Sequence, residues 1–401
     1  MGFPLALRLV RLWSGLPDVV ARRGSALSLP ADVDDERPTV IVVPGERSRL
    51  PLLCPILQRL GDPDDGLRVV IAGGFGVALP ECAERVISPG QSAARIRQLL
   101  QTLKPIAVIV VGNPFVPVWL AAADDGDVPV IAIDVQPARN AWTFWWLARA
   151  SSRQLLSRYS LMMTPDQKTA DGLVALGAER SNLVVTGPLS ELVRPPQYRP
   201  DEREAIKAGL GARPVWCAVD LPDEEIGMVL QAMDRAARGA HRLMLVVMPR
   251  NPAQLANILA AVTAAGHQAT VRSDGEDPDT ETSVYIADIF EEQGLWFSLA
   301  NVAYLGGTLS PIGAARSPMQ PASLGCAVVH GENYGDFGAS FALLQSAGAS
   351  RQVATWSELG DAIDALSVPD QQAKLAAKAW QISTSSADIA EQLHASLEKY
   401  Q

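Results

Sequence analysis

Three short loops carry the residues that could do chemistry in this chain of 401 residues. In the first loop, VVPGERSRLPLL (42–53), Glu46 follows a turn and stands where a helix is expected to begin. A carboxylate at that position is favoured by the helix dipole and could act as a general base. A helix-start carboxylate with no catalytic role fits the same pattern, so the residue alone leaves both interpretations open.

The other two loops favour anions. VMPRNPAQL (247–255) places Arg250 directly before a helix start at Asn251, and helix-start amides beside a guanidinium bind phosphate well. An arginine that merely ends a strand is the alternative. In LGGTLSPIGAARSPMQP (305–321), Gly306 and Gly307 permit close approach to the backbone, and residues 317–321 open a helix. Together the loops predict a nucleotide-monophosphate donor that is handled without metal.

Other common sites lack their signatures. AGGFGV (72–77) follows a strand but is not GxGxxG, and no phosphate loop, GxSxG elbow or HExxH pair occurs. DDGD (124–127) is interpreted as a solvated turn and not as a metal-binding carboxylate cluster. The four cysteines are far apart, which predicts neither a disulfide framework nor a zinc site. We therefore expect no metal and no cofactor.

The loops connect short aliphatic runs that alternate with amphipathic stretches, the pattern of doubly wound α/β domains. The pattern predicts a first domain over 38–190, a proline-rich linker over 191–205 and a second domain over 206–401 that ends in closing helices. Two such Rossmann-like domains usually face a central cleft, with ligands at the carboxyl ends of the strands. The strands expected in the two domains are 39–43, 67–73, 106–112, 128–134, 161–165 and 182–187, then 214–220, 241–249, 268–273, 283–288, 302–307 and 326–331.

Charge and the N-terminal segment limit the partners. A formal net charge of −10 gives no support to nucleic-acid binding. No run of apolar residues is long enough to span a bilayer. Residues 3–16 place leucines and a tryptophan on one helical face beside two arginines, so residues 1–30 are expected to form an amphipathic segment at an anionic membrane surface. A helix packed on its own domain is the alternative.

These motifs resemble those of the 3-deoxy-D-manno-octulosonic acid (Kdo) transferases, glycosyltransferases of GT-B fold. The resemblance covers most of the chain and is strongest over 213–353, in RPVWCAV, MPRNP, LWFSLANVAYLGGTLSPIG and QPASLG. It implies metal-independent, inverting transfer of Kdo from CMP-Kdo to a lipid A precursor in lipopolysaccharide biosynthesis. It also implies peripheral attachment to the cytoplasmic face of the bacterial inner membrane, which agrees with the expected segment 1–30.

The resemblance assigns roles to individual residues. The turn VPGE is similar to the family's Ser-Val-Gly-Glu turn, which makes Glu46 the catalytic base. PRNP is similar to the family's Pro-Arg-His-Pro turn, so the donor phosphate is expected at Arg250 and the helix-start amides near Asn251, which replaces the histidine. The cytidine and ribose are expected among Gly306, Gly307, Ser317 and Gln320. Aligned from its proline end, the loop has Ser317 and Gln320 where the family has Asn and Glu, and the Gln320 amide oxygen is expected to accept from a ribose hydroxyl.

The chain also departs from the family pattern, and other functions stay open. The family's Glu-Leu-Trp-Pro-Asn stretch corresponds to GNPFVPVWL (112–120), and its Ser-Thr-His-Pro-Gly-Glu-Glu to AVDLPDEE (218–225). These changes favour, as an alternative, a divergent or inactive paralogue that binds a nucleotide or glycolipid in a regulatory role. A sugar epimerase of related architecture would need acidic residues and a histidine at the sugar, and only His330 is expected near a cleft.

Overall fold

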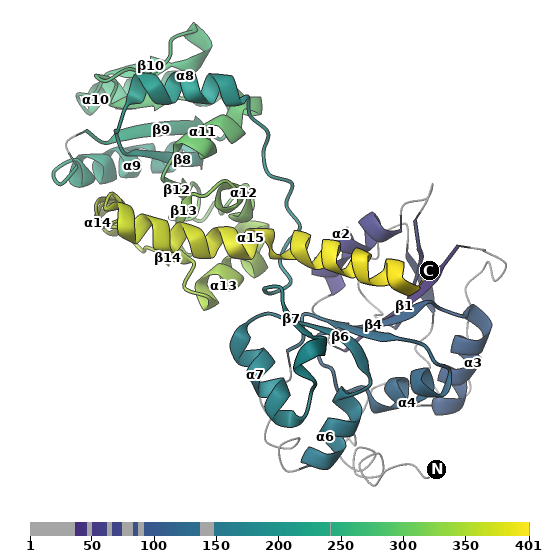
Figure 1. The fold of residues 1–401 in the computed structure, drawn as a ribbon. Helices are drawn as coiled ribbons and strands as arrows, with labels where there is room; N and C mark the ends of the chain where they lie inside the picture. The colour runs from purple at the N-terminus through teal and green to yellow at the C-terminus, as the bar shows by residue number, and fades with distance from the viewer. Residues whose placement is uncertain are drawn as a thin grey trace. The chain divides into compact units, whose positions relative to one another are not determined.

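The computed structural model describes residues 37–45, 50–61, 66–73, 83–86, 92–136, 148–240 and 242–400. The chain divides into two compact units, one of Met1–Leu192 with Ser385–Gln401 and one of Val193–Thr384. Each unit is built on a seven-stranded sheet whose strand pairs are all parallel (Figure 1). The predicted α/β class with two doubly wound domains is confirmed. Glu46 and the expected segment 1–30 lie outside the described residues.

The first unit has the strand order of a doubly wound Rossmann sheet, β3-β2-β1-β4-β5-β6-β7. Its central strands consist of aliphatic residues that are buried on both faces, as parallel sheets covered by helices require. The strands are β1 (Thr39–Pro44), β2 (Arg68–Ala72), β3 (Ala83–Val86), β4 (Ala107–Val111), β5 (Val130–Ile133), β6 (Tyr159–Thr164) and β7 (Leu183–Val185). The helices are α2 (Leu50–Leu60), α3 (Ala93–Leu103), α4 (Pro117–Asp125), α6 (Arg149–Leu156) and α7 (Gln167–Leu176), with the short η2 (Arg180–Asn182).

The second unit repeats the plan with one change at an edge. Its order is β10-β11-β9-β8-β12-β13-β14, so β11 lies between β10 and β9. The strands are β8 (Val215–Leu221), β9 (Met244–Pro249), β10 (Ala269–Val271), β11 (Val284–Ile286), β12 (Val302–Leu305), β13 (Ala327–His330) and β14 (Ser350–Gln352). Between and around them lie the longer helices α8 (Pro200–Leu210), α9 (Asp223–Ala236), α10 (Leu255–Ala264), α13 (Gly338–Ser346), α14 (Trp356–Leu366) and α15 (Pro369–Leu397). Shorter helical turns of this unit are η3 (Pro252–Gln254), η4 (Arg272–Asp274), η5 (Phe290–Glu292), α11 (Gln293–Leu299), α12 (Met319–Ser323) and η6 (Gly335–Phe337). The turn η7 (Glu398–Tyr400) follows α15 and belongs to the first unit.

Every strand expected from the sequence is present, but the sequence missed the edge strands β3 and β14. Both are short and carry charged residues, in AERV and SRQ, so neither makes the aliphatic run that marks a buried strand.

The division between the units also differs from the expected one. The sequence assigned 206–401 to the second domain, whereas the end of α15 belongs to the first unit. There Ile389, Leu393 and Leu397 are fully buried in the same apolar cluster as Val40 and Val42 of β1. Burying this apolar helix face against the first sheet explains why the helix returns to that unit.

The two crossings of the chain meet inside the first unit. Ser386 Oγ accepts a hydrogen bond from the Ser190 amide at 2.8 Å and donates one to the Ser190 carbonyl at 2.7 Å. Both serines are fully buried. The segment at Ser190, where the chain leaves the first unit, is thus hydrogen-bonded to α15, with which the chain returns to it.

Candidate functional site

The second unit brings two of the predicted loops to one edge of its sheet. Strands β9, β8 and β12 are neighbours, and their carboxyl ends carry Arg250 after β9, Asp220 near the end of β8, and Gly306 and Gly307 after β12. In open parallel sheets ligands bind outside the carboxyl ends of the strands. The structure therefore assembles Arg250 and the glycine loop as the sequence analysis expected.

A buried carboxylate that the sequence analysis did not assign to the site holds the glycine loop. Glu225, in the first turn of α9, is fully buried. One carboxylate oxygen accepts from the Tyr304 hydroxyl at 2.7 Å and from the Gly307 amide at 2.8 Å, and the other accepts from the Ser310 amide at 2.7 Å. Two backbone amides of the loop are thus already bound to the protein's own carboxylate.

The two glycines are required by backbone crowding. A Cβ on Gly306 would lie 2.7 Å from the Val219 carbonyl oxygen of β8. Gly307 has φ of +81°, which favours glycine, and a Cβ there would lie 2.3 Å from the Gly313 carbonyl oxygen. The glycines therefore serve the packing of the loop on β8 and on itself.

Arg250 is placed across this loop. Its Nη1 donates to the Gly313 carbonyl at 3.0 Å, and its backbone amide donates to the Leu221 carbonyl at 3.2 Å. The side chain is half-buried, and its other guanidinium N–H groups have no partner among the described residues. Arg250 thus combines a fixed position with free donors, which is the arrangement an anion needs.

The helix start at Asn251 is occupied by its own cap. The Asn251 side chain accepts from the Ala253 amide at 3.0 Å, and the Gln254 side chain accepts from the Asn251 amide at 2.7 Å. Pro252 has no amide hydrogen, and the Gln254 amide donates to the Asn251 carbonyl. This capping box satisfies the amides that were expected to hold phosphate.

Arg316 organises the far end of the loop, and the sequence analysis missed it. Its Nη2 donates to Asp220 Oδ1 at 2.7 Å and its Nε donates to Oδ2, so the pair is bidentate. Its Nη1 donates to Gln293 Oε1 and, at 3.1 Å, to Gln320 Oε1. Both members of the ion pair are largely shielded from solvent.

Arg316 also contacts Gln320. The Gln320 Oε1 accepts from Arg316, and its second lone pair can still accept from another donor, such as a ribose hydroxyl. The Gln320 Nε2 has no partner in the part of the chain that the structure describes, so it is a second group that Gln320 can offer a ligand. Ser317 is 2% exposed, and its Oγ accepts from the Met319 amide at the start of α12.

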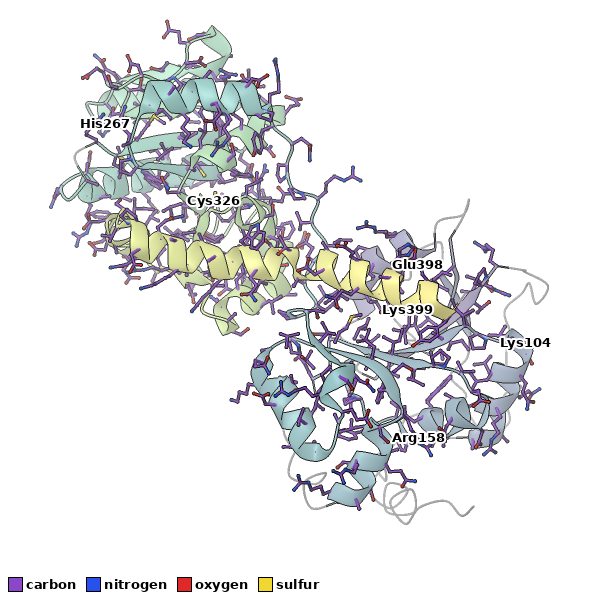
Figure 2. The ribbon with its side chains drawn as sticks, viewed as in Figure 1. Lys104, Arg158, His267, Cys326, Glu398 and Lys399 are labelled. Atoms are coloured by element: carbon purple, nitrogen blue, oxygen red, sulfur yellow. The ribbon has the colours of Figure 1, made fainter. Side chains whose placement is uncertain are left out.

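The buried histidine and cysteines of this unit do not supply reactive groups. Burial lowers the pKa of His330, whose ring contacts the Gly331 carbonyl, the Ser350 hydroxyl and the Phe341 ring. Burial raises the pKa of Cys326 to about 12, and it raises that of Cys217 as well. Cys326 lies inside the unit, whereas His267 lies at its surface (Figure 2) and pairs with Asp234.

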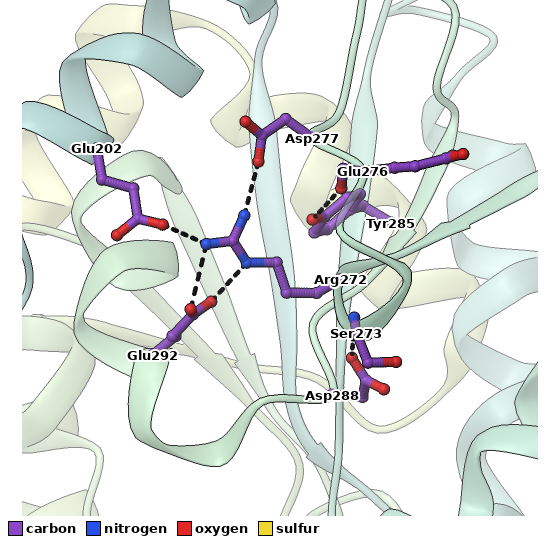
Figure 3. Close-up of polar contacts among 8 residues, drawn as sticks. All are labelled: Glu202, Arg272, Ser273, Glu276, Asp277, Tyr285, Asp288 and Glu292. Atoms are coloured by element: carbon purple, nitrogen blue, oxygen red, sulfur yellow. Dashed lines mark hydrogen bonds and ion pairs between the residues drawn. The ribbon is translucent and has the colours of Figure 1, made fainter.

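A second arginine cluster lies beside strand β10 and is structural. Arg272 contacts the carboxylates of Glu202, Asp277 and Glu292, which come from three different segments (Figure 3). These partners, led by the hydrogen bond to Glu292, raise the pKa of Arg272. With three carboxylates around one guanidinium the cluster carries excess negative charge, so it is no site for an anion.

In the first unit the described residues include the strand end before Glu46. Pro44, the last residue of β1, pairs with Val111 of β4, and a Cβ on Gly45 would lie 2.5 Å from the Asn113 carbonyl oxygen. At the end of β5, Asp134 is fully buried, has φ of +49° and accepts from the Leu189 amide at 3.1 Å. The loop that contains Glu46 therefore starts at the carboxyl edge, next to β4.

Two further classes of feature are missing from the described part of the chain. No group of three or more His, Cys, Asp or Glu side chains there could hold a metal ion. No described helix has the length and apolar character of a membrane span.

Comparisons with known proteins bear on the family. Residues 74–190 match a family model described as 3-Deoxy-D-manno-octulosonic-acid transferase (kdotransferase). A probable mitochondrial 3-deoxy-D-manno-octulosonic acid transferase of Arabidopsis thaliana is 24% identical over 72% of this chain and 66% of its own length. The enzyme named 3-deoxy-D-manno-octulosonic acid transferase in Bordetella pertussis is 25% identical over 60% of this chain and 56% of its own. The chain thus matches about three fifths of the length of these relatives.

Similar solved structures include the C-terminal CMP-Kdo binding domain of WaaA from Acinetobacter baumannii, with a TM-score of 0.43 and 23% identity. That match covers 45% of this chain and 96% of the domain. UDP-GlcNAc 2-epimerase from Neisseria meningitidis has a TM-score of 0.40 and 15% identity over 89% of this chain and all of the epimerase. The sequence matches, and not these structural scores, carry the comparison: much of the chain is similar in sequence, at low identity, to Kdo transferases.

Proposed function

We propose that the protein is a glycosyltransferase that moves Kdo from CMP-Kdo to a lipid A precursor. The observation that carries the proposal is the assembly of Arg250 and the glycine loop at the carboxyl ends of three adjacent strands, in a chain related to Kdo transferases. An arginine with free donors beside a fixed glycine loop suits the phosphate of a nucleotide monophosphate.

In this proposal the second unit binds the donor. Arg250 neutralises the CMP phosphate, which is also the leaving group, so its charge stabilises the transition state as the bond to the sugar breaks. Glu225 takes no part in binding, but it fixes the loop through the Gly307 and Ser310 amides. Arg316 orients the Gln320 amide by donating to its Oε1, and Gln320 donates its Nε2–H to a ribose hydroxyl oxygen.

The first unit supplies the acceptor side. Glu46 acts as general base: it takes the proton of an acceptor sugar hydroxyl, whose oxygen attacks the anomeric carbon of Kdo. The carbon–oxygen bond to CMP breaks on the opposite face, so the configuration inverts, and CMP leaves with its electron pair. No step needs a metal or a cofactor. The segment 1–30 holds the protein at the anionic cytoplasmic surface of the inner membrane, where the glycolipid acceptor lies.

The first test is calorimetric titration with CMP and with UMP in the absence of added metal. We expect CMP to bind in the micromolar range and Arg250→Ala to weaken binding by about tenfold to a hundredfold, since it removes charge-assisted hydrogen bonds. Arg238→Ala, which removes a charge from the same unit at a site away from the loop, is the control. Absence of CMP binding to the unmodified protein would refute the donor site.

A divergent or inactive paralogue with a regulatory role is the second candidate. Two features favour it. The self-capped helix start at Asn251 leaves its amides bonded to the protein, and a neutral Gln320 bonds a ribose hydroxyl more weakly than a glutamate would. The two candidates differ in the effect of Glu46→Gln. Loss of Kdo transfer to lipid A precursor, with CMP binding intact, would support catalysis. A Glu46→Gln variant that keeps its cellular role would support the regulatory reading.

A further inference from the structure

Two half-exposed glutamines meet at one guanidinium on the carboxyl edge of the second sheet. Gln293 begins α11, which lies between β11 and β12, and Gln320 lies in α12, which follows β12. The side-chain oxygens of both glutamines accept from the same atom, Nη1 of Arg316. The two amides are therefore neighbours in space, although only Gln320 belongs to the glycine loop and its helix.

The guanidinium that joins them is held on several sides. Arg316 donates to both carboxylate oxygens of Asp220, and its Cζ lies 5.8 Å from the centre of the buried Phe297 ring. Together with the two glutamines, these contacts occupy most of the N–H groups of Arg316. Arg316 thus positions its neighbours and has little left with which to bind a ligand itself.

The guanidinium also dictates which way each amide faces. Arginine has donors only, so each glutamine must present its oxygen to Arg316 and its NH₂ group elsewhere. Neither Nε2 has a partner among the residues that the structure describes. The backbone at the start of α11 is fixed as well, because a Cβ on Gly294 would lie 2.3 Å from the Gln197 carbonyl oxygen. The edge therefore carries two preset NH₂ donors side by side.

The charges at this edge separate two kinds of position. Asp220 balances the charge of Arg316, so the two amides lie in a locally neutral place. Arg250 keeps free charged donors, which suit a phosphate. Uncharged amide donors suit the uncharged oxygens of a nucleoside.

We propose that Gln293 binds the base of the donor nucleotide by donating its Nε2–H to O2 of the pyrimidine ring, and that Arg316 is the positioning residue for this contact. The inference rests on the proposed donor site, in which Gln320 bonds a ribose hydroxyl. In a pyrimidine nucleotide, O2 and the ribose 2′-hydroxyl lie on the same edge, which faces the minor groove when the nucleotide is part of a duplex. A ribose hydroxyl at Gln320 therefore brings O2 to the neighbouring Gln293. Cytosine and uracil both carry O2, so this contact recognises a base and does not distinguish these two.

The test compares two ligands on the full chain. Gln293→Met keeps the length of the side chain and removes its amide. We expect this variant to bind CMP about threefold to tenfold more weakly in calorimetric titration, which is the loss of one hydrogen bond to a neutral acceptor. Ribose 5-phosphate has the same sugar and phosphate but no base. Its affinity, measured by ³¹P NMR titration, should change by less than about twofold.

A second variant separates binding from stability. Gln293→Glu keeps an oxygen for Arg316 and loses the NH₂ donor, so the protein should unfold at no lower denaturant concentration while CMP binds at least about tenfold more weakly. Gln371→Glu, the same change at an exposed position near the start of α15, is the control and should leave CMP binding unchanged.

A double-mutant cycle tests the positioning role of Arg316. Arg316→Lys releases both amides, so adding Gln293→Met to it should weaken CMP binding by less than about twofold further. Full additivity of the two changes would show that Arg316 does not act through Gln293.

The outcomes distinguish this inference from the donor site on which it rests. If Gln293→Met binds CMP as the unmodified protein does, the base contact is overturned and the donor site stands. Equal losses for CMP and ribose 5-phosphate would also overturn it, because Gln293 would then act through the shape of the site. If the unmodified protein binds no CMP, the donor site and the base contact are both refuted.

Discussion

Because Glu225 accepts hydrogen bonds from the glycine loop, the variant Glu225→Gln is expected to destabilise that loop. The carboxylate accepts three hydrogen bonds with both oxygens, and it is fully buried. Burial, and then the charge of Glu225, raise the pKa of Tyr304, so the tyrosine hydroxyl stays protonated and donates. A glutamine keeps the shape but replaces one acceptor oxygen with an NH₂ donor. Whichever way the amide turns, a donor then faces a donor of the loop.

The magnitude follows from these contacts. One orphaned buried N–H costs about 1–3 kcal/mol, and the remaining hydrogen bonds lose the strengthening that a charged acceptor provides. We expect the loop to be destabilised by about 3 kcal/mol, which corresponds to about a hundredfold more frequent opening.

Hydrogen–deuterium exchange of peptides that cover residues 302–312 measures this opening directly. Glu224→Gln is the matched control, because Glu224 is the preceding residue of the same helical turn, is exposed, and loses the same charge. Its effect on exchange should stay within about 0.5 kcal/mol. If both variants exchange at the same rate as the unmodified protein, Glu225 does not hold the loop and the reasoning is refuted.

Three further predictions test other parts of the fold. Arg316→Ala leaves the buried carboxylate of Asp220 without its ion-pair partner, so it should lower the free energy of unfolding by about 3 kcal/mol in a denaturant titration. Arg316→Lys should recover little of this loss, because a lysine lacks the planar guanidinium that makes the bidentate pair. Ser386→Ala removes the hydroxyl that bonds both the amide and the carbonyl of Ser190, and it should cost about 2–4 kcal/mol. Ser383→Ala, which removes a hydroxyl that donates to the Trp380 carbonyl of its own helix, should cost under about 0.5 kcal/mol, and equal losses would contradict this. The pKa of about 12 leaves roughly one Cys326 thiol in a thousand ionised at pH 9, so thiol labelling at pH 9 should be slow when folded and fast in denaturant.

Much of the fold could be predicted from the sequence because its central strands are buried on both faces. Strands such as β1 and β4 are buried on both faces and therefore consist mainly of aliphatic residues, which appear in the sequence as an uninterrupted apolar run. The edge strands β3 and β14 have one neighbour each and carry charged residues, so no run marks them. The position of β11 between β10 and β9 depends on packing between segments that are distant in the sequence.

The candidate site divides in the same way. Arg250, Gly306 and Gly307 could be found because strand ends and glycine pairs are local signals. The role of Glu225 could not, since its partners in the loop lie 79 to 85 residues further along the chain. Arg316 and Asp220 are 96 residues apart. The capping box at Asn251 could have been predicted from the sequence, because an N-cap residue followed three residues later by Gln is a known local pattern.

The return of α15 has a consequence for how the protein can be divided. The second unit is an insertion between Leu192 and Ser385 of the first. The two segments that flank this insertion are hydrogen-bonded to each other through Ser190 and Ser386. A fragment that ends after the linker would lack the end of α15. It would therefore expose the apolar surface of the first unit that Ile389, Leu393 and Leu397 cover, and it should aggregate. A chimaera that keeps both flanks and exchanges only the insert preserves this cover, so the second unit is expected to be transplantable as an insert and not as a C-terminal half.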